Sequence, residues 1–322
     1  ANAFIHDIMT RLTIKYAIAL LAMTASVLFA GAQAPTTLFP YPTVPDSRTT
    51  LTERADYFVT HFWDRANIKQ SFSTLAKLNT AFGDWAELMP YCTADTVHAA
   101  IDKYIAAVVK TGGDNTLEMG KIAQNWFACD TAQYSSEELY LPFCRAVAEN
   151  KKVPSAERAR FRAELKILEN SSVGKRVADF RFTTPDGEQK NLYGEVAPSI
   201  ILFFNDPDCM DCIMAKTRFS ADFHVNSLID KGLLKIISIY PGEATAEWRE
   251  QAARYPQNWT VGACDGIDEY FDLEEMPAIY YLTSRHRVKA KNIIVDNLLH
   301  AIQLLDDQQA ATQPANPESA TE

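Results

Sequence analysis

The chain has 322 residues, a mass of 36.0 kDa and a formal net charge of −10. That length allows two domains, and 47% hydrophobic with 22% charged residues is the balance of a globular protein, which excludes wholesale disorder. The sequence has no basic stripe of the kind that nucleic-acid-binding proteins carry, so a nucleic-acid partner is excluded. Its six cysteines are too few for a disulfide scaffold and enough for one redox or metal site.

Residues 9–34 have the pattern of a secretory signal peptide. Arg11 and Lys15 begin it, an apolar run of 15 residues follows, and a small-x-small cleavage pattern ends it. The run is shorter than the roughly 20 residues that a membrane-spanning helix needs. We therefore expect residues 1–32 to be removed and the mature protein to be periplasmic, where disulfide chemistry is permitted. An inner-membrane anchor formed by an uncleaved signal is the alternative.

Residues 33–49 contain four prolines and predict a linker, or an extended arm laid on the surface. Thr50 and Glu53 then have the spacing of a capping box, and apolar residues recur at helical spacing after them. Residues 50–170 therefore predict an all-helical domain with no visible catalytic constellation. Its further helices are expected at about 68–88, 93–112, 115–128, 135–149 and 154–169.

After Gly174 the pattern changes to strands that alternate with helices. Residues 199–204 form a continuous apolar run, as in a central strand buried on both faces. Residues 171–306 therefore predict an α/β domain with a partly parallel sheet and helices on both faces, and residues 307–322 predict a disordered tail. A hairpin is expected at 179–193, strands at 233–240, 259–263, 278–282 and 288–291, and helices at 209–222, 244–254 and 294–305.

Cys209 and Cys212 form a C-x-x-C pair directly after the 199–204 strand. A redox pair needs its first cysteine at a helix N-terminus, because unpaired N–H groups and the helix dipole favour the attacking thiolate. Cys209 has that place and is expected to attack, while Cys212, one turn further, resolves the mixed disulfide. A zinc half-site would need a second ligand pair, which the sequence lacks, so no metal is expected. Two incidental cysteines in a helix are the remaining alternative.

A proline immediately precedes an apolar strand about 65 residues later, in Met276-Pro277. With the apolar 199–204 strand and the pair Cys209 and Cys212, these residues make the chain resemble the thioredoxin superfamily. The resemblance implies a thioredoxin fold and a cis Pro277 that faces the dithiol. It also implies that Met276 and Pro277 shape a substrate groove, in which the residue before the proline offers backbone hydrogen bonds to a bound peptide.

The resemblance is closest to the secreted TlpA/ResA-like thiol–disulfide oxidoreductases. Residues 174–187 of this chain resemble the N-terminal hairpin of those proteins. The helical half looks like a domain of unknown function that precedes such modules in secreted bacterial proteins. Such a protein would use no bound cofactor beyond its redox-active disulfide. Its partners would be thiol and disulfide proteins of the cell envelope, with a membrane or periplasmic thiol donor as the source of electrons.

Two departures from related families bear on the chemistry. Thioredoxin has a buried acid six positions before its first cysteine, where this chain has Phe203. Peroxiredoxins need a proline seven positions before their cysteine and a threonine or serine three positions before it. In this chain those positions hold Leu202 and Asp206, which disfavours peroxidase chemistry.

Acidic residues are concentrated in the half that carries the dithiol. Residues 171–322 hold 14 basic and 23 acidic residues, net −9, against 15 and 17, net −2, in residues 33–170. Asp208 and Asp211 flank the cysteines and are expected to tune the thiol pKa, because nearby anions oppose the thiolate. Strong oxidants of this fold stabilise the thiolate, so we expect a weakly oxidising or reducing protein. The alternative is that some of these acids point into solvent, where salt screens them over about 10 Å.

The other four cysteines are not expected to be catalytic. Cys129 and Cys144 have the spacing for a disulfide between neighbouring helical segments. The alternative is that they and Cys92 are small buried apolar residues. Cys264 has no visible partner. Two functions remain. One is a periplasmic thiol–disulfide oxidoreductase, which the intact C-x-x-C and Pro277 favour. The other is a binding module for an envelope protein or glycan, in which the thioredoxin-like half is a scaffold.

Overall fold

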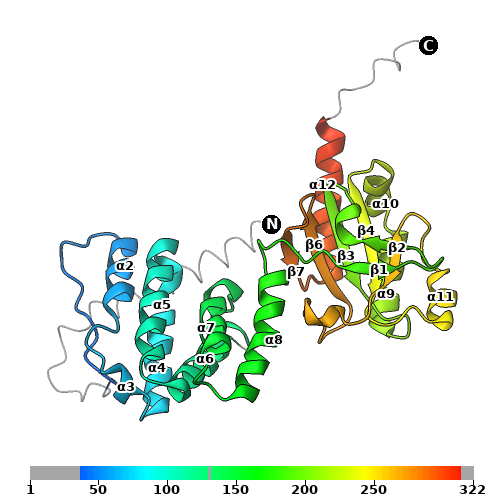
Figure 1. The fold of residues 1–322 in the computed structure, drawn as a ribbon. Coiled ribbons are helices and arrows are strands. Elements are labelled where there is room, and N and C mark those ends of the chain that lie inside the picture. The colour runs from blue at the N-terminus through cyan, green and yellow to red at the C-terminus, as the bar shows by residue number, and fades with distance from the viewer. Residues whose placement is uncertain (1–36, 130–131, 313–322) are drawn as a thin grey trace.

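The computed structural model describes residues 37–129 and 132–312, and the expected signal peptide at residues 1–32 lies outside them. The described chain forms a helical half followed by a half built on a sheet (Figure 1). None of the helices in this described part is both long enough and apolar enough to cross a membrane.

The helices of the N-terminal half follow the predicted order. Thr50 and Glu53 form the expected capping box, in which each side chain accepts a hydrogen bond from the backbone N–H of the other. The single helix expected at 68–88 is two helices, because the Ser71 and Ser73 hydroxyls bond back to carbonyls of the preceding turn and favour a break. The elements are α2 (Leu51–His61), α3 (Ile68–Ser71), α4 (Leu75–Ala86), η2 (Met89–Tyr91), α5 (Ala94–Val109), α6 (Gly113–Phe127), α7 (Glu137–Glu149) and α8 (Ser155–Ser171).

The described part of the proline-rich segment is an arm packed on these helices. Phe39 is buried, and its ring centroid lies 5.5 Å from that of Phe62 and 5.2 Å from that of Trp63. Tyr41 follows with a 2.6 Å hydrogen bond from its hydroxyl to Asp84. The arm therefore completes the aromatic core of the helical half, of which Trp85 is a central, fully buried member.

The C-terminal half is built on a seven-stranded mixed sheet of order β2-β1-β5-β4-β3-β6-β7. The strand β3 is parallel to β4 and antiparallel to β6, and β4 is parallel to β5. The strands are β1 (Arg181–Thr183), β2 (Gln189–Asn191), β3 (Ser199–Phe204), β4 (Leu234–Tyr240), β5 (Thr260–Ala263), β6 (Ala278–Thr283) and β7 (Val288–Lys291).

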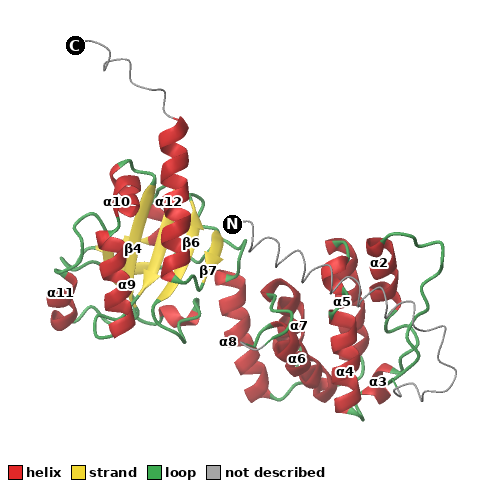
Figure 2. Cartoon of the chain, turned by 180° about the vertical axis from the view of Figure 1, so that it is seen from behind, coloured by secondary structure: helices red, strands yellow, loops and turns green. Residues whose placement is uncertain are grey.

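Alternate residues of β3 are buried on opposite faces of the sheet. Ile201 and Phe203 pack under α9 (Met210–Ala221), α10 (Phe223–Asp230) and α12 (Val295–Thr312), which lie in front of the sheet in Figure 2. The opposite face of the sheet is covered by the short turns η3 (Leu192–Gly194) and η4 (Ile267–Glu269) with the residues around them. The expected cover on both faces is therefore present, with 3₁₀ turns rather than long helices on the second face.

The last helix is longer than predicted. It continues to Thr312, so the first residues of the tail expected at 307–322 are helical. The buried carboxylate of Asp306 explains this extension. It accepts hydrogen bonds from Lys231 at 2.7 Å and from Ser227 at 3.0 Å, which hold α12 against α10.

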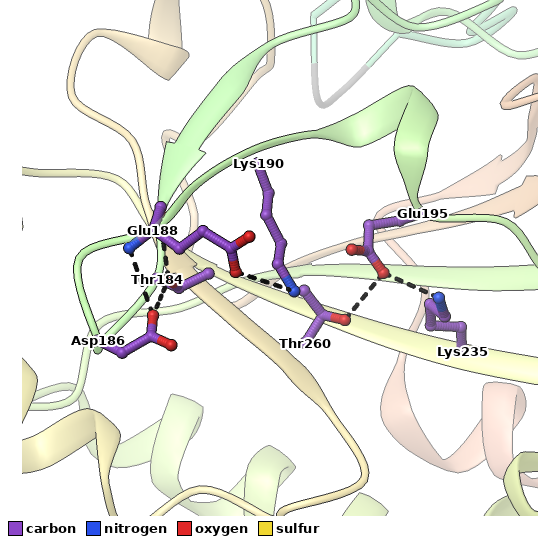
Figure 3. A network of polar contacts seen from close by, with 7 residues as sticks. All are labelled: Thr184, Asp186, Glu188, Lys190, Glu195, Lys235 and Thr260. Carbon is purple, nitrogen blue, oxygen red and sulfur yellow. Dashed lines mark hydrogen bonds and ion pairs between the residues drawn. The ribbon is translucent and has the colours of Figure 1, made fainter.

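Polar contacts join the segment before β3 to β4 and β5 at the edge of the sheet where β3 and β4 begin (Figure 3). The buried side chain of Glu195 accepts hydrogen bonds from Lys235 at 2.8 Å and from Thr260 at 3.0 Å. Burial alone would raise the pKa of Glu195, but these two bonds outweigh burial and hold the pKa below its usual range. The network therefore fixes the edge opposite to the one where β3 ends.

The aromatic arm yields a stability prediction. We expect Phe39→Ala to lower the free energy of unfolding of the helical half by about 3 kcal/mol, because it removes a buried ring and leaves a cavity. Denaturant unfolding followed by circular dichroism measures this loss. Phe223→Ala is the matched control, since that ring is 75% exposed and its removal should change the free energy little. Equal losses in the two variants would contradict the packed arm.

Candidate active site

The pairing of β3 with β6 brings two loops of the candidate site together. In the antiparallel register Phe204 lies opposite Ala278, so the loop after β3 meets the residues just before β6. Cys209 follows β3, and Met276 and Pro277 precede β6. The Met276–Pro277 peptide bond is cis, as the resemblance implies. The sheet thus places the cysteine pair and the proline at one edge, although 65 residues separate them along the chain.

Cys209 is the N-cap of α9. Its sulfur accepts a hydrogen bond from the backbone N–H of Cys212 at 3.3 Å and lies 3.9 Å from the carbonyl oxygen of Met276. An N-cap sulfur close to unpaired N–H groups is in a position that favours its thiolate. Cys209 is a half-buried residue, whereas Cys212 is buried.

Cys212 lies one turn further along α9 and is only 2% exposed. Burial raises the pKa of the Cys212 thiol to about 12, helped by its interaction with Cys209 and by repulsion from Asp206. A hydrogen bond with the backbone of Asp206 acts in the opposite direction and lowers this pKa, but its effect is smaller than that of burial. The two cysteines therefore differ in access, which is the division needed between an attacking and a resolving thiol.

The position of the missing acid is filled by an aromatic ring. Phe203 is fully buried and packs edge-on against Phe219, with ring centroids 5.7 Å apart. The nearest polar cluster lies two residues later, at the end of β3. There Tyr255 donates a 2.5 Å hydrogen bond to the side-chain oxygen of Asn205, whose amide nitrogen donates to Ser238 at 2.7 Å.

This buried cluster is electrostatically linked to the dithiol. Burial raises the pKa of Tyr255 to about 12, and the negative charge of an ionised Cys212 adds to the shift. The ammonium group of Lys216 lies 4.2 Å from the centre of the Tyr255 ring. Sequence reasoning missed Asn205, Tyr255 and Lys216 as members of the site. Only Asn205 carried a signal, as a polar residue that directly follows a fully apolar strand.

The acids around the dithiol have different surroundings. Asp206 acts on the buried thiol, whereas the Asp208 carboxylate accepts a 3.1 Å hydrogen bond from Gln251 on α11 (Ala246–Ala252). Asp211 is exposed in the first turn of α9. The structure therefore gives Asp206 the direct electrostatic contact with Cys212, and the expected tuning by Asp208 and Asp211 stays a prediction.

The helical half braces the loop that leads to Pro277. Lys166 of α8 forms an ion pair with Glu269, and its ammonium group lies 4.0 Å from the centre of the Tyr270 ring. At the β7 edge Lys291 forms a second ion pair, with Glu137 at the start of α7. Figure 1 shows α8 between the other helices and this side of the sheet. Both halves therefore contribute to the surroundings of the substrate groove expected at Met276 and Pro277.

The remaining cysteines lie outside this site. Cys144 is a buried thiol whose sulfur lies 3.4 Å from the Phe161 carbonyl oxygen, so the predicted option of a Cys129–Cys144 disulfide is not formed. Burial raises the pKa of Cys144 and of Cys92 to about 12 and that of Cys264 to about 11. Across residues 37–129 and 132–312, no three potential metal ligands gather into one group.

The helical half contains a hollow of about 480 Å³. It lies where η2 and the start of α5 meet the segment before α7. On its rim His98 Nε2 lies 3.1 Å from the carboxylate of Glu138, and its lining includes Cys92. Neither Cys209 nor Cys212 lines this hollow.

Comparison with known proteins agrees with this division of the chain. Residues 22–171 match the family model of a domain of unknown function, DUF5106. A thioredoxin-like protein from Bacteroides caccae is similar in structure, with a TM-score of 0.64 and 23% identity over 84% of this chain and 99% of its own. The chain therefore has a helical domain followed by a thioredoxin fold.

Other solved structures match one half of the chain. A conserved protein of unknown function from Bacteroides fragilis is 31% identical over 41% of this chain and 99% of its own, with a TM-score of 0.39. The thioredoxin domain of a thiol-disulfide oxidoreductase from Bacteroides vulgatus is 15% identical over 42% of this chain and 99% of its own, with a TM-score of 0.37. No curated protein matches the chain.

The unequal burial of the two thiols predicts unequal alkylation. In the reduced protein at pH 8, iodoacetamide should label Cys209 at least roughly tenfold faster than Cys212, because the thiolate reacts and burial suppresses it. Labelling of Cys212 should accelerate about tenfold per pH unit between pH 7 and 9, since its pKa lies near 12. Peptide mass mapping follows both sites. Equal labelling at pH 7 would contradict the assignment of roles.

The effect of Asp206 is testable in the same assay. Asp206→Asn should raise the labelling rate of Cys212 by roughly threefold, because it removes a charge that opposes the thiolate. Asp230→Asn is the control, since this exposed acid ends α10 near the start of β4, at the opposite edge of the sheet. If Asp206→Asn leaves the labelling rate of Cys212 unchanged, the charge of Asp206 does not act on Cys212.

Proposed function

We propose that the protein is a thiol–disulfide oxidoreductase that exchanges its Cys209–Cys212 dithiol with disulfides of other proteins. One observation carries the proposal: the half-buried sulfur of Cys209 caps α9, receives the Cys212 N–H and lies 3.9 Å from the carbonyl oxygen that precedes Pro277. A scaffold or binding module would need no such arrangement. The thioredoxin fold agrees with this chemistry and does not by itself establish it.

The reaction needs only the two thiols and the partner disulfide. The Cys209 thiolate attacks one sulfur of the partner, whose S–S bond breaks, and the other partner sulfur leaves as a thiolate that takes a proton from solvent. Cys212 then loses its proton and attacks the Cys209 sulfur, which releases the second partner sulfur. The partner gains two electrons, and the protein becomes the Cys209–Cys212 disulfide. A dithiol donor must return those electrons before the next cycle.

We place the protein on the reducing side of this exchange. Strongly oxidising members of the fold stabilise their thiolate. Here Asp206, Asp208 and Asp211 surround the cysteines, and the sequence has no lysine, arginine or histidine between Asn205 and Ala215. These acids oppose the formation of a thiolate at the N-terminus of α9, and the half-buried cation Lys216 lies against the Tyr255 ring.

The cellular setting is also part of the proposal. The signal-like segment at residues 9–34 supports a periplasmic protein, or one anchored to the inner membrane by an uncleaved signal. In either case the partners would be thiol and disulfide proteins of the cell envelope, with a membrane or periplasmic thiol protein as electron donor. No bound cofactor is required, because the disulfide itself carries the electrons.

A trapping experiment tests the proposed function. Cys212→Ser removes the resolving thiol, so mixed disulfides with Cys209 should accumulate when the reduced variant meets native envelope proteins. Nonreducing electrophoresis and peptide mass mapping detect them. Cys209→Ser is the matched control and should trap nothing above background. If Cys212→Ser also traps nothing, and the wild-type protein reduces no disulfide, the binding alternative replaces the enzyme.

A further inference from the structure

An exposed apolar face lies directly beside the dithiol. Met210 and Met214 are 68% and 51% exposed, stand one turn apart on α9, and therefore share one face of that helix. Arg218, one turn further on the same face, forms an ion pair with Asp296 of α12. The exposed side chain of Ile294 is two residues from that ion pair. Methionines adapt their shape to different partners, so this face suits irregular apolar surfaces.

Acidic side chains border this face near the cysteines. Asp208 and Asp211 lie on the α9 side, and Glu274 and Glu275 lie on the loop that leads to the cis peptide. All four are exposed, and no ion pair among the described residues neutralises any of them. The nearby cation Lys216 is half-buried and directed at the Tyr255 ring instead.

We propose that this surface selects its partner, as an extension of the proposed function on which it rests. The surface consists of Met210 and Met214 with the bordering acids Asp208, Asp211, Glu274 and Glu275. Its occupant is an extended polypeptide segment whose disulfide cysteine has basic and apolar neighbours. Apolar neighbours cover the methionines, and lysine or arginine neighbours meet the unpaired carboxylates, which accelerates encounter and orients the disulfide towards Cys209.

Charge selection is tested with three peptides. Each contains a single cysteine, activated as a mixed disulfide with 2-nitro-5-thiobenzoate, and the peptides differ only in the residues beside that cysteine. The neighbours are lysine and leucine, glutamate and leucine, or lysine and serine. Stopped-flow absorbance measures release of the thiobenzoate by the reduced full chain. At low ionic strength the lysine–leucine peptide should react about tenfold faster than the glutamate–leucine peptide, and the ratio should approach one in about 1 M salt. The acids change the reactivity of Cys209 equally for every peptide, so the ratio isolates recognition.

Variants assign the selection to this surface. Glu274→Gln with Glu275→Gln should reduce the lysine-to-glutamate ratio at least roughly threefold, whereas Asp230→Asn at the opposite edge of the sheet should leave the ratio unchanged. Met214→Gln should reduce the leucine-to-serine ratio roughly threefold. Val196→Gln is its control, because Val196 is equally apolar, 64% exposed and close to the start of β3. Thermal unfolding verifies that each variant is folded.

The outcomes separate this inference from the proposed function. Release from all peptides at equal, salt-independent rates would overturn the partner selection and leave the oxidoreductase intact. Faster reaction of the glutamate–leucine peptide would also overturn the selection. No release from any peptide by the reduced protein would overturn the proposed function itself.

Discussion

The burial of β3 on both faces is the constraint on which the C-terminal half depends. All six residues from Ser199 to Phe204 pair with β4 on one side and with β6 on the other. Since β4 runs parallel and β6 antiparallel to β3, the end of β3 meets the start of β6. The loop that begins α9 therefore comes to lie against Met276 and Pro277, and the N-terminus of α9 is aimed at the same place.

The inner position of β3 that could hold a buried acid is occupied by an aromatic ring. The side chain of Phe203 points under α9 into a dry aromatic cluster, where an ionised carboxylate would need a partner to offset its desolvation. Hydrogen-bond partners for a polar side chain are first available at the end of the strand. There Asn205 has partners for both its amide nitrogen and its oxygen, in Ser238 and Tyr255. Burial is the main cause of the high pKa of the resolving thiol, and its interaction with Cys209 adds to the shift.

Local patterns predicted the elements and the central part of the site, because their causes lie within a few residues. The capping box at Thr50, the apolar run of β3 and the position of Cys209 at the start of a helix are of this kind. Helix α10 was not predicted; it begins directly after α9, where the Asp222 side chain accepts a hydrogen bond from the Val225 N–H. Nor did periodicity reveal that Phe39 belongs to the helical core, since its ring partners Phe62 and Trp63 come from the residues directly after α2.

Contacts between distant residues account for the rest of what the sequence did not disclose. Tyr255 lies 50 residues after Asn205, and no local pattern links the two. The extension of α12 depends on Lys231, 75 residues before Asp306. The support that α8 gives to the loop before Pro277 comes from Lys166, 103 residues before its partner Glu269. In each case the partner of one polar side chain lies in a segment far away along the chain.

The central claim is that Cys209 and Cys212 form a reversible redox couple on the reducing side. Equilibration of the protein in glutathione buffers, and in dithiothreitol buffers for more negative potentials, with mass mapping of the peptide that contains both cysteines, measures this couple directly. The account predicts one two-electron transition, with loss of two hydrogens from that peptide, at a potential more negative than about −180 mV. A transition near about −120 mV would contradict the reducing assignment. No transition at all would contradict the redox site.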